Sequence, residues 1–82
     1  MSQHQQEDEA IKVYQQAIEL EPGESSFYRG LAKLQAQKGE LEIAIANYRK
    51  AIELNPEQPA WVNRHLNKAL GKQKSLEEVM AV

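Results

Sequence analysis

The feature that most constrains the fold of this chain is a thirteen-residue segment that occurs twice, 34 residues apart. Residues 10–22 are AIKVYQQAIELEP and residues 44–56 are AIANYRKAIELNP, with eight of the thirteen positions identical. A fixed period of about 20–50 residues is typical of arrays in which one structural unit stacks on the next. The whole chain has 82 residues, which is enough for one small domain, so the repeat predicts a single short array.

Apolar residues recur in both copies with the spacing of an amphipathic helix. The i, i+3, i+4, i+7 pattern places them on one face of each helix: Leu41, Ala44, Ile45, Tyr48, Ala51 and Ile52 in the second copy, and Ala10, Ile11, Tyr14, Ala17 and Ile18 in the first. Phe27, Leu31 and Leu34 form a similar stripe between the copies. No segment shows the alternation of a β-strand, so the predicted fold class is all-α.

Proline and glycine mark the expected helix ends. Pro22 and Pro56 follow the two copies, and a proline ring biases the preceding residue away from helix. Gly39 suits the left-handed cap between two helices. A further helix is expected from Pro59, because proline is well placed in the first turn of a helix.

The two ends of the chain give weaker signals. Ser75 and Glu78 have the spacing of a capping box, which predicts a last short helix that contains Leu76, Val79 and Met80. The polar residues 1–6 are expected to be a disordered tail. About five helices are therefore expected in all.

Residues 25–56, SSFYRGLAKLQAQKGELEIAIANYRKAIELNP, resemble a tetratricopeptide repeat over their whole length. Tyr28 stands where the family usually has Trp, Ala32 replaces a small Gly, and Gln35 replaces a Tyr. The other matching residues have the family spacing: Leu31, Gly39, Ala44, Tyr48, Ala51 and Pro56. The resemblance implies antiparallel helix-turn-helix units stacked as a short right-handed solenoid.

The same resemblance divides the chain into parts of one domain, residues 7–82. Residues 7–22 match the second helix of a partial repeat, and residues 25–58 make a complete repeat. Residues 59–82 fit a degenerate, truncated repeat shifted by one residue. This division suggests a piece of a larger multi-repeat protein.

The resemblance also implies a function, because the first helices of such repeats line a concave face that binds peptides or proteins. Carried onto this chain, the expected partner-binding residues are Ser26, Arg29, Lys33, Gln37, Asn63, Arg64, Asn67 and Lys68, with Ala36 beside them. Their cations would accept an acidic peptide segment through charge-assisted hydrogen bonds. The alternative is that these residues only solvate an ordinary helix surface. Trp61 is open to the same two interpretations, as inter-helix packing or as an anchor for a partner.

Charge is distributed unevenly along the chain, although the net charge is only −2. Residues 1–24 carry six acids and one base, whereas residues 59–82 carry four bases and two acids. An acidic first helix and a basic last region favour a second hypothesis, a structural homo-oligomerisation or spacer unit formed through exposed terminal helices.

Other classes of function lack support in the sequence. No catalytic arrangement of Ser, His and acids has a suitable spacing, so the chain is not expected to be an enzyme or to need a cofactor. His4 and His65 lie far apart in a chain without cysteine, so no metal site is expected, and His65 is expected to be a packing residue. The acidic balance argues against nucleic acid, and no membrane span or signal peptide is expected, which favours a cytoplasmic location.

Overall fold

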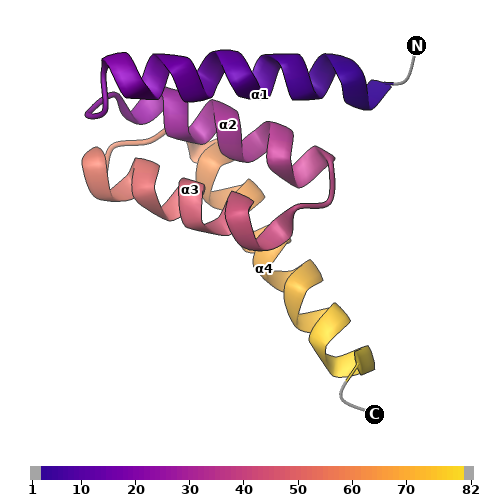
Figure 1. Ribbon diagram of the computed structural model, residues 1–82. Coiled ribbons are helices and arrows are strands. Elements are labelled where there is room, and N and C mark those ends of the chain that lie inside the picture. The colour runs from indigo at the N-terminus through magenta and orange to yellow at the C-terminus, as the bar shows by residue number, and fades with distance from the viewer. Residues whose placement is uncertain (1–2, 81–82) are drawn as a thin grey trace.

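The chain folds into four helices, each of which packs against the next (Figure 1). The computed structural model describes residues 3–80, which form α1 (Gln3–Leu20), α2 (Ser25–Gln37), α3 (Leu41–Leu54) and α4 (Ala60–Met80). In Figure 1, α1, α2 and α3 lie side by side, and the C-terminal half of α4 extends away from them. The predicted all-α stack of helix pairs is confirmed.

The core lies between α2, α3 and α4 and is built around small side chains. Ala32 of α2 and Ala44 and Ala51 of α3 are completely buried, as expected where two helix backbones approach closely. Tyr48 is the largest completely buried side chain together with Val62 of α4. The repeated Ala and Tyr positions therefore form the helix–helix contacts in the complete repeat.

The turn between α2 and α3 has the geometry expected at Gly39. This glycine has a φ of 87°, in the left-handed region that a side chain disfavours. Its backbone N–H donates to the carbonyl of Ala36 at 3.0 Å, and the N–H of Glu40 donates to the carbonyl of Gln35 at 2.9 Å. These bonds satisfy carbonyls that the end of α2 would otherwise leave without a partner.

One amide side chain joins the end of α3 to α2. Gln58 donates from Nε2 to the carbonyls of Ala51, at 3.0 Å, and Asn55, at 2.9 Å. Its Oε1 accepts a hydrogen bond from Arg29 Nη1 at 3.0 Å. The loop after Pro56 is thereby held against the complete repeat before α4 begins.

The separate last helix expected after Ser75 is not present, because α4 runs without a break from Ala60 to Met80. A capping box requires non-helical backbone before it, and no proline or left-handed glycine interrupts residues 71–75. Gly71 alone is tolerated inside a helix at a cost of about 1 kcal/mol. Lys74 occupies the place of the turn glycine and lets the helix continue.

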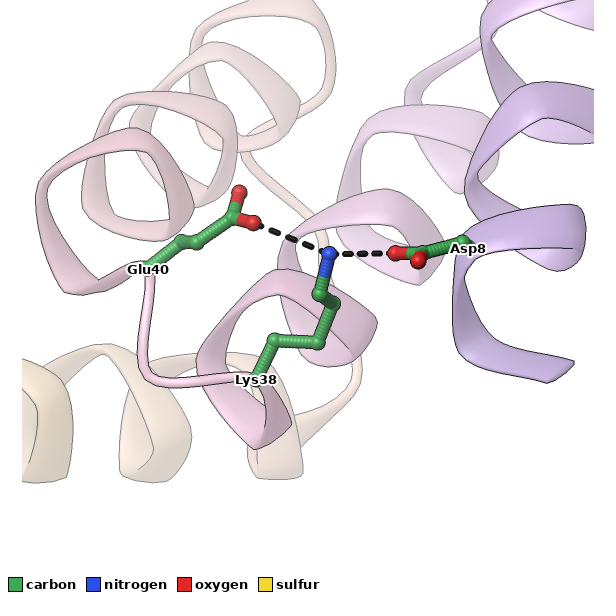
Figure 2. A network of polar contacts seen from close by, with 3 residues as sticks. All are labelled: Asp8, Lys38 and Glu40. Atoms are coloured by element: carbon green, nitrogen blue, oxygen red, sulfur yellow. Dashed lines mark hydrogen bonds and ion pairs between the residues drawn. The ribbon is translucent and has the colours of Figure 1, made fainter. Parts of the chain in front are cut away.

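The start of α1 also differs from the expected disordered tail, because residues 3–6 already belong to the helix; residues 1 and 2 lie outside the described part. Figure 2 shows a polar contact that fastens this end of α1. Lys38 donates to Asp8 of α1 and lies 3.2 Å from Glu40 Oε1. These contacts, chiefly the hydrogen bond with Asp8, raise the pKa of Lys38. The position equivalent to Leu41 of α3 is Glu7 in α1, so the second turn of α1 contacts the end of α2 through an ion pair and not through an apolar side chain at this position.

Candidate partner-binding groove

An aromatic stack lies at the point where α4 begins to cross the complete repeat. The rings of Trp61 and His65 meet edge to face, with centroids 5.2 Å apart. His65 also contacts Tyr48 of α3, whose hydroxyl lies 3.4 Å from His65 Nδ1. Lys33 of α2 places its Nζ 5.5 Å from the centroid of the Trp61 ring, within range of a cation–π interaction.

Two neighbouring hollows open beside this stack. The smaller, of about 240 Å³, lies between α2 and α4 and is lined by Lys33, Ala36, Gln37, Leu41, His65, Lys68, Ala69 and Lys72. The larger, of about 620 Å³, lies between α1 and α2, with Trp61 at its edge. Lys33 and Gln37 line both hollows. We call the smaller hollow, together with Trp61 and Arg64 beside it, the α2–α4 groove.

The α2–α4 groove is positively charged and partly apolar. Its cations are Lys33, Arg64, Lys68 and Lys72, and no Asp or Glu is among the described residues that line either hollow. Burial lowers the pKa of His65, and the nearby charges of Lys33, Lys68 and Arg64 lower it further. The imidazole is therefore held in its neutral form by an environment that favours anions.

The structure brings together most of the expected partner-binding residues. Ser26, Arg29, Lys33 and Gln37 line the larger hollow, and Lys68 joins Lys33 and Gln37 in the smaller one. Arg29 is partly occupied, because it donates to Gln58.

Asn63, Arg64 and Asn67 line neither hollow. Arg64 nevertheless lies close enough to lower the pKa of His65. Asn63 and Asn67 are exposed, and each is turned by about 100° or more from the residues of α4 that line the smaller hollow.

A one-residue shift between repeats explains the position of these two asparagines. Tyr14 and Tyr48 are equivalent residues 34 apart in the sequence. Tyr14 lies against Gly30 of α2, where an added Cβ would be 2.6 Å from the tyrosine hydroxyl, whereas Tyr48 contacts His65 of α4. These contact partners are 35 residues apart, so each position of α2 corresponds to the residue of α4 35 places later.

With this offset of 35 residues, different residues of α4 become the counterparts of the partner-binding residues of α2. Ser26, Arg29, Lys33 and Gln37 of α2 correspond to Trp61, Arg64, Lys68 and Lys72 of α4. The sequence analysis included Arg64 and Lys68 among the partner-binding residues and kept Trp61 as one of two interpretations, but it did not include His65 and Lys72. The signal was present, since residues 59–82 already fitted a repeat displaced by one position.

Among the described side chains, no group of three or more His, Asp or Glu residues is placed to hold a metal ion. None of the helices in residues 3–80 combines the length and apolar character that a bilayer crossing needs.

Comparison with known proteins identifies two matching family models and a relative. A model described as TPR repeat matches residues 32–73, and one described as tetratricopeptide repeat matches residues 2–24. Photosystem I assembly protein Ycf3 of Synechococcus sp. (strain CC9605) is 40% identical to this chain over 55 residues. The aligned part covers 63% of this chain and 32% of that protein, so the similarity extends over about a third of the relative's length.

Proposed function

Because this chain belongs to the tetratricopeptide repeat family, we propose that it is a non-catalytic protein-binding module whose α2–α4 groove takes up an acidic segment of its partner. The observation that carries this proposal is the convergence of Lys33, Lys68 and Lys72 around one hollow, with no Asp or Glu among the described residues that line it. Carboxylates of a partner would form charge-assisted hydrogen bonds with these ammonium groups.

Trp61 adds an apolar element to the same surface. Its ring is half-buried and is held from one side by His65 and from another by Lys33. Rigid aromatic side chains of this kind are common anchors of protein interfaces. We therefore favour a partner segment that carries an apolar side chain next to its acids.

The relative supports the same class of work. Its name describes a protein of photosystem I assembly. We propose that this chain binds a protein during the assembly of a complex. A cytoplasmic location remains a prediction for this chain.

Charge reversal in the groove tests the proposal. The probe is a fluorescent peptide of Asp, Glu and Leu, with its Asn/Gln counterpart as control, and binding is measured by anisotropy. Lys33→Glu with Lys68→Glu should weaken binding at least about tenfold, because hydrogen bonds to charged groups contribute about 1.5–3 kcal/mol each. Arg29 is left unchanged in this test, since its bond with Gln58 would confuse binding with folding.

Arg49→Glu combined with Lys12→Glu is the matched control, because both residues are exposed cations that line neither hollow and the net charge changes by the same amount as in the test variant. Its affinity should stay within about twofold of the wild-type value, as rim or distant charges contribute little. Bound carboxylates should also raise the pKa of His65, which NMR can follow. Equal losses in both variants, or no loss in either, would refute binding in this groove.

A second candidate function is self-association. Val13 and Leu20 of α1 are 64% and 84% exposed, and Val79 and Met80 of α4 are similarly open to solvent. Light scattering decides whether the chain associates, and it does so independently of peptide binding.

A further inference from the structure

One face of α1 is partly exposed, whereas the same face is buried in α3, the equivalent helix of the complete repeat. Ala44, Tyr48 and Ala51 of α3 are completely buried, whereas the corresponding Ala10, Tyr14 and Ala17 of α1 are only half-buried. α1 packs against α2 alone. On its other side, Val13 is exposed and no helix within residues 3–80 covers it.

α4 presents the complementary face. With the 35-residue correspondence, Ala32 and Gln35 of α2, which are buried in the complete repeat, become Asn67 and Leu70 of α4. Asn67 is exposed and Leu70 is only partly buried. α4 contacts α3 and α2, and none of the described helices covers this second side.

Along the chain, second and first helices of a repeat alternate. The exposed face of α1 would therefore normally pack on a first helix, and the exposed face of α4 on a second helix. α1 and α3 are second helices of a repeat, and α2 and α4 are first helices. We propose that α1 of a second copy packs on α4 in the way that α3 packs on α2, so that two copies together complete the repeat that α4 begins. This inference specifies the self-association candidate and does not depend on ligand binding in the groove.

The side chains at the proposed junction match. In the complete repeat, Asn47 donates to Gln35 at 2.7 Å across the α2–α3 contact. The residues at the same two places in the junction are Val13 of the second copy and Leu70. A polar pair inside the chain is thus replaced by an apolar pair, and two partly exposed apolar side chains would cover each other.

The charges at the ends of these helices also match. In the complete repeat, the end of α2 lies beside the start of α3, so the start of α1 from the second copy would lie near Lys72 and Lys74. Glu9 is exposed on that part of α1, and residues 1–24 carry a net charge of −5 against +2 for residues 59–82. Glu77 and Glu78 lie one turn beyond Lys74, where the antiparallel pairing would place them opposite the uncharged Gln6 and Gln5 of the docked helix.

The two surfaces differ from each other, so the contact is heterologous and does not close on itself. Each copy would use α1 toward one neighbour and α4 toward the other. Analytical ultracentrifugation should show a weight-average mass that rises continuously from micromolar to millimolar concentration and does not level off at a dimer.

Blocking the two faces separately tests the geometry. Val13→Arg places a charge on the α1 face, and Asn67→Arg places one on the α4 face; both sites are exposed, so both variants should keep the wild-type circular dichroism. Each variant alone should be monomeric. An equimolar mixture should form a 1:1 dimer and nothing larger, because each variant keeps one functional face.

Several results would overturn the proposal. A wild-type chain that stays monomeric at millimolar concentration contradicts it, as does association that persists in Asn67→Arg alone, which would indicate an α1–α1 contact. Lys33→Glu serves as the control and should leave the mass distribution unchanged. Acidic-peptide binding is measured separately on Val13→Arg, so that failure of the junction and failure of the groove can be distinguished.

Discussion

Two glycines inside helices offer a direct test of how α1 packs on α2. Gly30 lies in α2 and Gly71 in α4. Replacing a glycine by alanine inside a helix should stabilise the fold by about 0.5–1 kcal/mol, because alanine loses less backbone entropy. At Gly71 an added Cβ would meet nothing within 4 Å, so Gly71→Ala should show this gain in full.

At Gly30 the same methyl group meets the ring of Tyr14. The added Cβ would lie 2.6 Å from Tyr14 Cζ and Oη and 2.8 Å from Cε1, so the tyrosine must move. Overpacking of this kind typically costs about 1–3 kcal/mol. Set against the helix gain, Gly30→Ala should be destabilised by roughly 0–2.5 kcal/mol, although the substitution is chemically the same as at Gly71.

Thermal unfolding followed by circular dichroism, at a concentration where the chain is monomeric, separates the two variants. In a domain of this size, 1 kcal/mol changes Tm by about 4–8 °C, so Gly71→Ala should melt above the wild type and Gly30→Ala at or below it. In a Tyr14→Leu background, Gly30→Ala should become stabilising. If Gly30→Ala stabilises the wild type as much as Gly71→Ala does, the close contact between α1 and α2 is refuted.

Three other perturbations test the core and the groove. Ala51→Leu should lower the free energy of unfolding in urea by about 1–3 kcal/mol, because Ala51 of α3 is completely buried and a larger side chain would overpack its surroundings; an unchanged midpoint would mean that this side of α3 is not tightly packed. Asn47→Ala should cost about 1–3 kcal/mol by leaving the buried Gln35 without its donor, and Gln35→Leu combined with Asn47→Val should recover much of that loss. Stability should decrease as the pH falls below about 6.5, because the pKa of His65 is lowered in the folded state and the unfolded chain therefore binds the proton more readily; His65→Gln should remove this part of the pH dependence in urea titrations.

The first three helices were predictable because their cues are local. Each has an apolar stripe with helical spacing, and proline or glycine follows at its end, as Pro22, Gly39 and Pro56 show. The structure ends α1 at Leu20 and α3 at Leu54, two residues before the prolines. Such signals need no knowledge of the neighbouring helices.

The end of the chain was harder to predict because its cues conflict. Ser75 and Glu78 have the spacing of a helix start, but only an interruption before them would make that start real, and the structure has none. The beginning of α1 depends on Lys38, which is 30 residues from Asp8 in the sequence. Long-range contacts of this kind leave no pattern in either segment alone.

The groove residues also could be predicted only in part from the sequence. Lys33 and Lys68 were predicted to face a partner, and both line the hollow. Asn63 and Asn67 were predicted there together with Arg64 and Lys68, whereas the contact of Tyr48 with His65 places each residue of α4 35 positions after its counterpart in α2. A single position on a helix turns a side chain by about 100°, so a one-residue shift makes Arg64 and Lys68, and not the two asparagines, the counterparts of Arg29 and Lys33.

The dependence of α1 on one neighbour has a consequence for how the molecule opens. Among the described helices, α1 contacts only α2, whereas α2 and α3 are each packed on more than one side. Loss of α1 would leave the buried cluster around Tyr48 and Val62 intact. Amide hydrogens of α1 should therefore exchange through a partial opening with a lower free energy than global unfolding, and the molecule should have two levels of protection along its length.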